Sequence, residues 1–255
     1  SPGGLVTALK PALEAIEGSS WVGWDGGHPV PPRVSGIDVE LHGVSLTRRE
    51  VDDHYHGFAN RTLWPLLHGL VREPVFDRRL WDAYCVANRR FADADPGGPA
   101  LRWVHDYQLM VLPDLLRRRG AAGPLGFFLH IPFPPPEIFA RLPWREPVLR
   151  GLLGADVLSF HTRGYRDNFL RTCARVLHEV SVEGGHVRLG DGRRVTVAVN
   201  PISIDADELG ARARRPAVER RLAALEERFS DCRVVLGVDR LDFTKGIPER
   251  LRAFE

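Results

Sequence analysis

The sequence predicts an α/β protein built on a doubly wound parallel sheet, for three reasons. Several short runs are apolar throughout rather than alternating, as strands covered on both faces should be. Amphipathic helical stretches separate these runs, and strands that alternate with helices form parallel sheets. Polar residues follow directly at the ends of the runs, where open parallel sheets bind their ligands. The predicted strands are residues 101–106, 124–130, 155–161 and 232–240.

Helices are predicted where apolar residues recur every three or four positions. Leu5, Leu9, Leu13 and Ile16 have this spacing near the N-terminus. Further helices are predicted at residues 112–120, 165–177 and 216–229, and from Pro248 onward. Residues 182–199 differ, because they alternate around Gly-Asp-Gly and therefore predict a β-hairpin.

Two Rossmann-like lobes are expected, with residues 1–215 forming the first and residues 216–255 the start of the second. The strand at 232–240 would begin the second sheet. At the N-terminus a glycine-rich turn, residues 1–4, leads directly into a helix with no strand before it. At the other end the last helix stops after about two turns. We therefore expect a chain that is cut at both ends.

The composition excludes several classes of protein. The chain has 255 residues, with 35 Lys and Arg against 33 Asp and Glu, so its net charge of +2 does not favour a nucleic-acid partner. Its three cysteines are far apart in the sequence and lack the paired spacing of a zinc site or a disulfide framework. No apolar run approaches the roughly 20 residues that span a bilayer, and no signal-peptide pattern is present. A cytoplasmic protein with no membrane partner is expected.

Four predicted strands end in polar residues, namely Asp106, His130, His161 and Asp239 with Arg240. Because the carboxyl ends of parallel strands share one edge of a sheet, these side chains are expected to lie near one another. Each of them alone could instead be a helix cap or a satisfied hydrogen-bond partner. The strand that ends at His130 runs into Ile-Pro-Phe-Pro-Pro-Pro, and the prolines are expected to hold this loop rigid.

A second cluster lies at residues 238–250, VDRLDFTKGIPER. Arg240 and Lys245 stand beside the N-terminus of a predicted helix, where free N–H groups and the helix dipole favour an anion. A guanidinium and an ammonium together suit a diphosphate. The alternative is a surface salt-bridge cluster in which Asp239 and Asp242 are the partners.

Three aromatic residues, Trp24, Tyr55 and Trp64, are candidates for the walls of a sugar site or for the core. Tyr55 and Trp64 are nine positions apart, a spacing that does not place two side chains together on one face of an α-helix. From spacing alone the core is the favoured interpretation.

Seven runs, in order along nearly the whole chain, closely resemble the trehalose-6-phosphate synthase family. They are GGL, GFANRTLWPLLH, WVHDYQLM, GFFLHIPFPPPEIF, LLGADVLSFHT, PISID and GVDRLDFTKGIPERLRAFE. The resemblance implies a GT-B fold of two Rossmann-like lobes and a glycosyltransferase of trehalose biosynthesis. Such an enzyme moves glucose from a nucleotide sugar to glucose 6-phosphate with retention, giving α,α-trehalose 6-phosphate. Gln108 and Phe243 depart from the family's usual His and Tyr.

The resemblance also implies site residues, position by position. The donor side would consist of Gly4, His130, Arg240 and Lys245, and the acceptor side of Trp24, Tyr55, Trp64 and Asp106. The residues closest to the chemistry would be Asp106, His130, Arg240 and Lys245. Asp106 is expected to position the acceptor or hold a sugar hydroxyl rather than to act as a nucleophile.

According to the resemblance, no cofactor and no metal are required, and the nucleotide-glucose is a co-substrate. UDP-, GDP- and ADP-glucose stay open as donors, and assembly as a homo-oligomer stays open too. Two other readings are a non-catalytic homologue that binds a sugar phosphate and another GT-B enzyme, such as a glycogen-synthase-like transferase. Because a GT-B reaction takes place between two lobes, the 255-residue chain alone is expected to be inactive.

Overall fold

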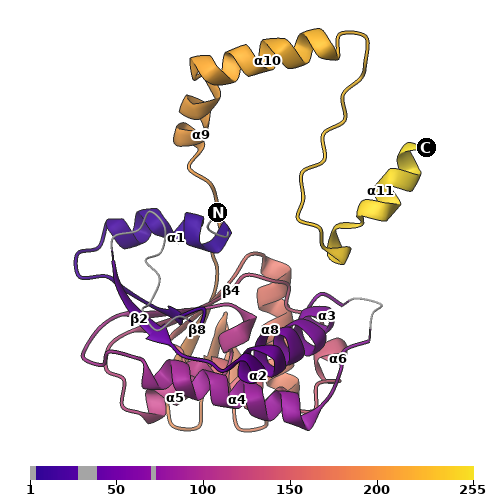
Figure 1. Cartoon of the computed structure of the whole chain (residues 1–255). Coiled ribbons are helices and arrows are strands. Elements are labelled where there is room, and N and C mark those ends of the chain that lie inside the picture. Colours follow the sequence, from indigo (N-terminus) through magenta and orange to yellow (C-terminus); the bar gives the residue numbers. More distant parts are fainter. Residues whose placement is uncertain (1–3, 28–38, 70–72) are drawn as a thin grey trace. The chain divides into compact units, whose positions relative to one another are not determined.

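The computed structural model describes residues 4–27, 39–69 and 73–255 and divides the chain into two compact units, Ser1–Ser203 and Ile204–Glu255. Figure 1 shows the elements of both units, which are described separately below. The division between residues 215 and 216 that was expected from the sequence falls within the second unit. Of the predicted glycine-rich turn, residues 1–3 lie outside the described residues.

The first unit contains most of the regular structure. Its strands are β1 (Ser20–Trp24), β2 (Glu40–Val44), β3 (Arg102–His105), β4 (Leu125–Leu129), β5 (Val157–Phe160), β6 (Ser181–Glu183), β7 (His186–Arg188) and β8 (Arg194–Val199). Its α-helices are α1 (Gly4–Glu14), α2 (Arg48–Val51), α3 (Trp64–Leu67), α4 (Arg78–Asp93), α5 (Leu112–Arg118), α6 (Pro136–Phe139), α7 (Arg145–Leu152) and α8 (Arg163–Val176). A π-helix, η1 (Asp52–Leu63), and a short 3₁₀-helix, η2 (Tyr107–Leu109), complete it.

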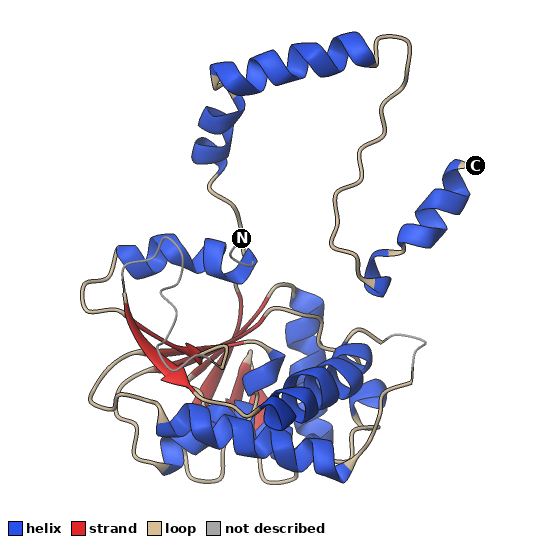
Figure 2. Cartoon of the chain, in the orientation of Figure 1, coloured by secondary structure: helices blue, strands red, loops and turns tan. Residues whose placement is uncertain are grey.

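The main sheet has the strand order β3-β4-β5-β8-β7-β6. Figure 2 shows the strands in red beside the helices in blue. Strands β3, β4, β5 and β8 run parallel to one another, whereas β7 pairs antiparallel with both β8 and β6. Three predicted strands are thereby confirmed as β3, β4 and β5, and the predicted α/β class with a parallel sheet is confirmed with them. Since β8 lies beside β5, the polypeptide crosses over through α8 before it returns to the sheet.

The predicted hairpin at residues 182–199 is confirmed by β7 and β8, but the segment contains a second hairpin that the alternation did not reveal. Gly184 and Gly185 join β6 to β7, and both have positive φ angles, 53° and 85°. A tight turn between two antiparallel strands needs such angles, which glycine adopts without steric cost. The antiparallel part of the sheet is therefore three strands wide.

Near the N-terminus the predicted helix is confirmed as α1, which begins at Gly4. The next segment contains two strands that the sequence analysis did not predict. Residues 20–24 and 40–44 form the strands β1 and β2, which pair in parallel as a small separate sheet. Five-residue strands interrupted by Gly23 and Gly43 lack a long apolar run, so the sequence pattern did not identify them.

Apolar side chains from the helices and the central strands form one continuous core. Helix α8 packs on β5 and the antiparallel strands, while α4 packs against η1 and α5. Helix α7 packs against α5. The turn after α7 comes closest, since a Cβ atom added at Gly154 would lie 2.2 Å from the backbone nitrogen of Asp114. Helix α5 follows directly on the loop that leaves β3, so this contact fixes the end of that loop.

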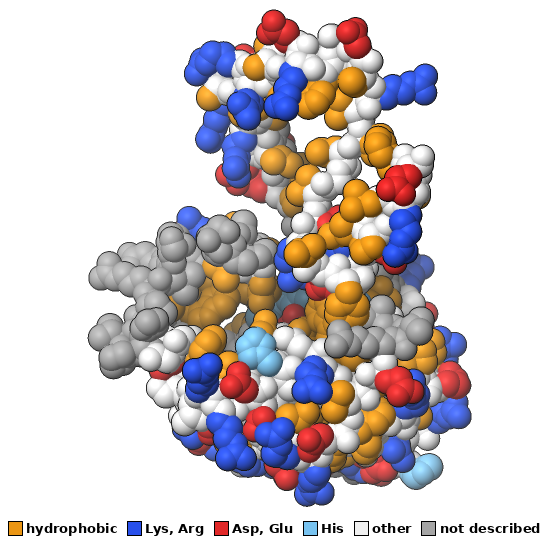
Figure 3. All heavy atoms as spheres, turned by 45° about the vertical axis from the view of Figure 1, so that its right-hand side comes forward, with side chains coloured by type: hydrophobic (Ala, Val, Ile, Leu, Met, Phe, Trp, Pro, Cys, Tyr) orange, Lys and Arg blue, Asp and Glu red, His pale blue; other side chains and the backbone are white. Residues whose placement is uncertain are grey.

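The second unit consists of α9 (Ala206–Ala213), α10 (Pro216–Arg228), η3 (Phe243–Lys245) and α11 (Ile247–Phe254). The predicted helices at 216–229 and after Pro248 are confirmed, but the predicted strand at 232–240 is wrong, since residues 233–240 have no regular structure. A strand needs a hydrogen-bonded neighbour, and none of the described strands pairs with this segment. Its apolar side chains are exposed; Val235 and Leu236 are 78% and 84% exposed. Figure 3 shows hydrophobic side chains, in orange, on the surface of the chain.

Candidate functional site

Strands β3, β4 and β5 end side by side, and each is followed at once by a polar residue. Asp106, His130 and His161 are these residues, and the parallel registers of the three strands bring them to one edge of the sheet. The backbone N–H of His130 donates to Asp106 Oδ1 at 3.2 Å, and the rings of His130 and His161 are 5.8 Å apart. The predicted convergence is therefore confirmed for these three residues. Asp239 and Arg240 belong to the second unit and not to this sheet.

Asp106 has an unusual backbone conformation. Its φ of 73° and ψ of 170° make it the one non-glycine residue with positive φ in the described part of the chain. Its carboxylate also accepts a hydrogen bond from the N–H of Tyr107 at 3.0 Å. Burial raises the pKa of Asp106 to about 6, although both backbone hydrogen bonds act in the opposite direction. Strain and a shifted pKa at one residue are frequent signs of a functional role.

A third histidine joins this edge and was not among the sequence candidates. His105, the last residue of β3, places its Nδ1 3.1 Å from Nε2 of His130. Burial lowers the pKa of His105 to about 3 and that of His130 to about 4, with the neighbouring imidazole as a smaller cause in each case. Burial also lowers the pKa of His161. Near neutral pH these rings are therefore uncharged hydrogen-bonding groups.

The proline-rich loop that follows His130 is anchored in the core. Ile131 and Phe133 are buried, and the Phe133 carbonyl accepts a hydrogen bond from Asn168 Nδ2 on α8 at 2.9 Å. Pro135 and Pro136 then lead into α6. The loop therefore holds the backbone of His130 in place on its C-terminal side.

The aromatic candidates are not core residues as a group. Trp24, at the end of β1, is 49% exposed, and Tyr55, on η1, is 43% exposed, so the core interpretation is wrong for both. Trp64 is half-buried against the core, with its ring 4.1 Å from that of His68 and 5.5 Å from that of Tyr107. Exposed aromatic faces are available to a ligand.

The π-helix that carries Tyr55 is tied to the loop after β3. Tyr107 follows Asp106 directly, and its hydroxyl donates to Asn60 Oδ1 on η1 at 2.8 Å. Asp53, also on η1, is buried and pairs with Arg79 of α4 at 2.6 Å. These bonds fix η1 relative to the strand-end residues.

Arg240 and Lys245 lie in the second unit, around a turn that ends at Gly246. Burial acts to raise the pKa of Asp242, but hydrogen bonds from Thr244 and the charges of Arg240 and Lys245 lower it. Asp239 pairs with Arg250 at 2.7 Å rather than with either candidate cation. Within residues 204–255 neither Arg240 nor Lys245 forms an ion pair. The salt-bridge alternative therefore holds for Asp239, whose partner is Arg250, while Arg240 and Lys245 act on Asp242 through their charges without an ion pair in residues 204–255.

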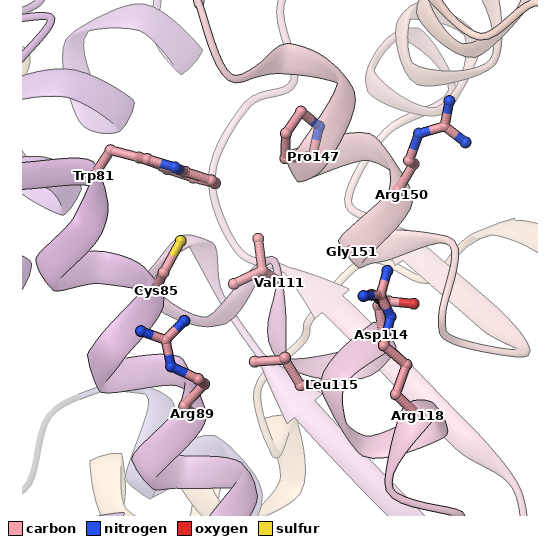
Figure 4. Close-up of a pocket in the computed structure, with 10 residues that line it drawn as sticks. All are labelled: Trp81, Cys85, Arg89, Val111, Asp114, Leu115, Arg118, Pro147, Arg150 and Gly151. Atoms are coloured by element: carbon pink, nitrogen blue, oxygen red, sulfur yellow. Dashed lines mark ion pairs between the residues drawn. The ribbon is translucent and has the colours of Figure 1, made fainter. Parts of the chain in front are cut away.

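A hollow of about 290 Å³ lies elsewhere on the first unit, among side chains of α4, α5 and α7 (Figure 4). None of the candidate site residues lines it. Arg118 is paired with Asp114 at 2.8 Å, and Arg150 with Glu146 and Glu179, so carboxylates offset two of its three guanidinium groups. The hollow therefore offers weak attraction for an anion, and the strand-end edge is the better candidate site.

Comparison with known proteins indicates the family of the chain. The sequence profile of glycosyltransferase family 20 matches residues 1–255. The chain belongs to glycosyltransferase family 20. A trehalose-6-phosphate synthase of Mycobacterium sp. (strain KMS) is 44% identical over 269 residues, which cover 99% of this chain and 54% of the relative. The trehalose-6-phosphate synthase of Mycobacterium avium (strain 104) is also 44% identical, over 100% of this chain and 55% of its own length.

Solved structures of family 20 proteins share the fold. The trehalose-6-phosphate synthase OtsA superposes with a TM-score of 0.88 at 33% identity and covers all of this chain, which corresponds to 56% of OtsA. A structure from E. coli bound with UDP-2-fluoro glucose gives a TM-score of 0.87 at 33% identity, over 99% of this chain and 57% of that one. The predicted family and the GT-B type of fold are confirmed. The chain spans about half the length of the curated relatives it matches.

Two kinds of feature are absent from the described residues of this family 20 chain. No helix in residues 4–27, 39–69 and 73–255 combines the length and apolar character needed to cross a membrane. Over the same ranges, His, Cys, Asp and Glu side chains form no group of three or more that could hold a metal ion.

Proposed function

We propose that the protein containing this chain transfers glucose from a nucleotide-glucose to glucose 6-phosphate with retention, giving α,α-trehalose 6-phosphate. The observation that carries the proposal is the match of relatives named trehalose-6-phosphate synthase across 99% to 100% of the chain. The strand-end cluster and the cations Arg240 and Lys245 would supply the chemistry that such a transfer needs.

On the donor side we assign Gly4, His130, Arg240 and Lys245. The main charge to be stabilised develops on the leaving diphosphate, and the two cations, which form no ion pair within residues 204–255, are suited to it. With these cations present, the proposed reaction requires no metal and no cofactor. UDP-glucose is the first donor to test, because a solved neighbour binds UDP-2-fluoro glucose; GDP- and ADP-glucose are the others.

On the acceptor side we assign Trp24, Tyr55, Trp64 and Asp106. The exposed faces of Trp24 and Tyr55 can cover a sugar ring, and the Asp106 carboxylate can accept a hydrogen bond from a sugar hydroxyl. With a pKa of about 6, Asp106 is mostly ionised at pH 7 and accepts rather than donates. Its role in the proposal is to orient the acceptor, which contributes through positioning.

We further propose that residues 1–215 belong to the acceptor lobe and residues 216–255 to the donor lobe. The protein would act in the cytoplasm, where sugar phosphates and nucleotide sugars are its partners, with no nucleic acid and no membrane involved. Whether it forms a homo-oligomer is measured by light scattering on the full-length protein.

A second function is favoured by one neighbour. The N-terminal domain of a trehalose-6-phosphate phosphatase from Candida albicans has a TM-score of 0.83 and 30% identity over 92% of this chain. The same lobe therefore also occurs in a protein named for another activity. The second candidate is a homologue that binds sugar phosphate without transferring glucose.

The deciding experiment uses the full-length protein. It is incubated with glucose 6-phosphate and with UDP-, GDP- or ADP-glucose in turn, and the product is identified by NMR, which also reports the anomeric configuration. We expect α,α-trehalose 6-phosphate with at least one donor and none from the 255-residue chain alone. Binding of glucose 6-phosphate without turnover of any donor would select the second candidate, and a different product would reject the proposal.

Two variants of the full-length enzyme test the division of the site. Lys245→Ala should lower kcat/KM by roughly 100-fold, because a contact to developing charge is worth about 3 kcal/mol. Tyr55→Phe should raise the KM for glucose 6-phosphate more than that for the donor, by roughly tenfold or less, because one hydrogen bond is removed. Initial rates with each substrate varied separate the two effects. Equal changes in both KM values for Tyr55→Phe would contradict the assignment of Tyr55 to the acceptor.

A further inference from the structure

His105 makes direct side-chain contact with His130. Its Nδ1 lies 3.1 Å from His130 Nε2, and the two rings are 5.3 Å apart with an angle of 34° between their planes. Trp103 covers His105 at 4.6 Å, and Phe128 covers His130 at 4.5 Å. The two imidazoles are thus held between aromatic rings and joined by one hydrogen bond.

A hydrogen bond between two neutral imidazoles restricts both of them. Each neutral ring has one nitrogen that donates and one that accepts. If His105 carries its proton on Nδ1, then Nε2 of His130 must accept, and the proton of His130 is on Nδ1. If Nδ1 of His105 accepts, the arrangement is reversed. In either case Nε2 of His130 is occupied, and Nδ1 is the ring nitrogen left to meet a ligand.

His161 makes no hydrogen bond to the His130 ring in the described part of the chain. The N–H of Ile202 donates to His161 Nδ1 at 3.3 Å, so the proton of the neutral His161 ring is on Nε2. The rings of His161 and His130 are 5.8 Å apart, with an angle of 64° between their planes. The hydrogen bond that orients the His130 ring is therefore the one to His105.

We propose that His105 is a positioning residue, which holds the ring of His130 and couples its tautomer to that of His105, so that Nδ1 faces the transferred sugar. The inference rests on the proposed function for the role of His130, but the contact between the two rings does not depend on that role. Partners of catalytic or metal-binding histidines commonly fix the tautomer in this way.

The variants are chosen by the position of their polar atoms. In His105→Asn the side-chain amide reaches the position of Nδ1 and can still donate or accept, whereas His105→Phe keeps a ring of similar volume without nitrogen. His105→Gln places its amide near the position of Nε2 and replaces the Phe variant if that variant does not fold. Trp103→Phe is the control for lost packing against His105.

The first measurement is the ¹⁵N NMR spectrum of the histidine rings in the full-length protein, with His130 assigned from the His130→Gln variant. We expect one tautomer of His130 in the wild type, in His105→Asn and in Trp103→Phe, and averaged ring-nitrogen shifts in His105→Phe or His105→Gln. Unchanged His130 shifts in those last two variants would overturn the proposal.

The second measurement is steady-state kinetics of the same proteins. His105→Phe should lower kcat/KM for the nucleotide-glucose roughly tenfold, as expected for one hydrogen bond, while the KM for glucose 6-phosphate stays unchanged. His105→Asn should restore most of the loss. An equal loss in both variants would show that packing alone is at stake and would overturn the proposal. If no donor is turned over at all, the proposed function fails, and the NMR result still decides the role of His105.

Discussion

Asp106 combines a costly backbone conformation with a buried carboxylate. Among non-glycine residues a φ of 73° with a ψ of 170° is rare, and such conformations cost on the order of 1 to 3 kcal/mol. The surrounding hydrogen bonds from Tyr107 and His130 hold it there. Stability is thus given up at the residue that we assign to the acceptor.

Replacing this carboxylate should stabilise the fold near neutral pH. Burial raises the pKa of Asp106 from an ordinary value of 3.8 to about 6. The contribution of this carboxyl group to the free energy of unfolding is therefore fully present below pH 3.8 and is lost as the pH rises through 6. Asp106→Asn removes the buried charge, keeps an acceptor and tolerates positive φ. At pH 7 the variant should gain up to about 3 kcal/mol over wild type, and at pH 3.8 nothing.

Urea unfolding of the wild type and the variant at several pH values measures the difference between their free energies of unfolding. The contribution of the histidines is common to both proteins and cancels in this difference. The variant should also lose transferase activity in the full-length enzyme. If the two free energies of unfolding run parallel between pH 4 and pH 7, the Asp106 carboxyl is not the buried acid described here.

The clustering of the strand-end residues could be predicted from the sequence, because it requires only that the strands pair in parallel. Asp106 and His130 follow apolar runs, and parallel pairing alone brings them together. His105 could not be singled out, since a histidine inside a strand gives no signal until its neighbour on the next strand is known. The exposure of Trp24 was missed because strand β1 was not predicted, and that of Tyr55 because the assumed helical period did not apply to it.

At the scale of elements, the π-helix η1 explains that failure. The sequence argument used the α-helical repeat, in which residues nine apart lie on different faces. In η1 the hydrogen bonds join residues five apart, so nine positions span about two turns. The pattern of apolar residues does not distinguish a π-helix from an α-helix, because which of the two forms depends on packing against α4. The strand expected at 232–240 failed for a related reason, since pairing partners are not encoded in the run itself.

The start of strand β3 is held by the guanidinium of Arg102, in which every N–H group donates a hydrogen bond. Arg102, only 8% exposed, donates from Nε and one terminal nitrogen to Asp95, at 2.8 Å each. Its other N–H groups donate to the carbonyls of Gly98, Ala100 and Ala122. All five donors of the side chain therefore have partners, and the loop before β3 is fastened to the loop before β4.

Breaking this clamp should cost much more than breaking a surface pair. Asp95→Ala leaves the Arg102 charge buried without its counter-ion, which should cost about 3 to 5 kcal/mol. The control is Asp82→Ala on α4, which removes the exposed pair of Asp82 with Arg78 at 3.0 Å and should cost about 0.5 kcal/mol. Thermal and urea unfolding compare the two variants. Losses of equal size would mean that water screens the clamp as it does the surface pair.

At the scale of the whole molecule, the two units differ in their interior. The first contains a continuous apolar core, whereas none of residues 204–255 is buried. Burial of apolar surface is the main source of folding free energy. Helices α9, α10 and α11 therefore depend on their local hydrogen bonds, and isolated helices of this length are marginal in water.

A chain ending at residue 203 should therefore unfold at the same urea concentration as the 255-residue chain. Amide hydrogens in α10 should exchange rapidly, and those in β4 and β5 slowly. The matched control ends at residue 176, which removes β8, the parallel neighbour of β5, and should not fold. A lower midpoint for the chain ending at 203 would show that the second unit contributes to the stability of the first.

The close approach of α7 to α5 also limits which sequences can encode this fold. At Gly164, on α8, an added Cβ would meet nothing nearer than a side-chain oxygen at 3.8 Å, so many residues fit there. At Gly154 and Gly151 it would meet backbone atoms at 2.2 Å and 2.6 Å. A clash with a side chain can be relieved by a second mutation, but every residue has the same backbone. These two positions therefore admit no compensating change, and variation in this lobe has to take place around them.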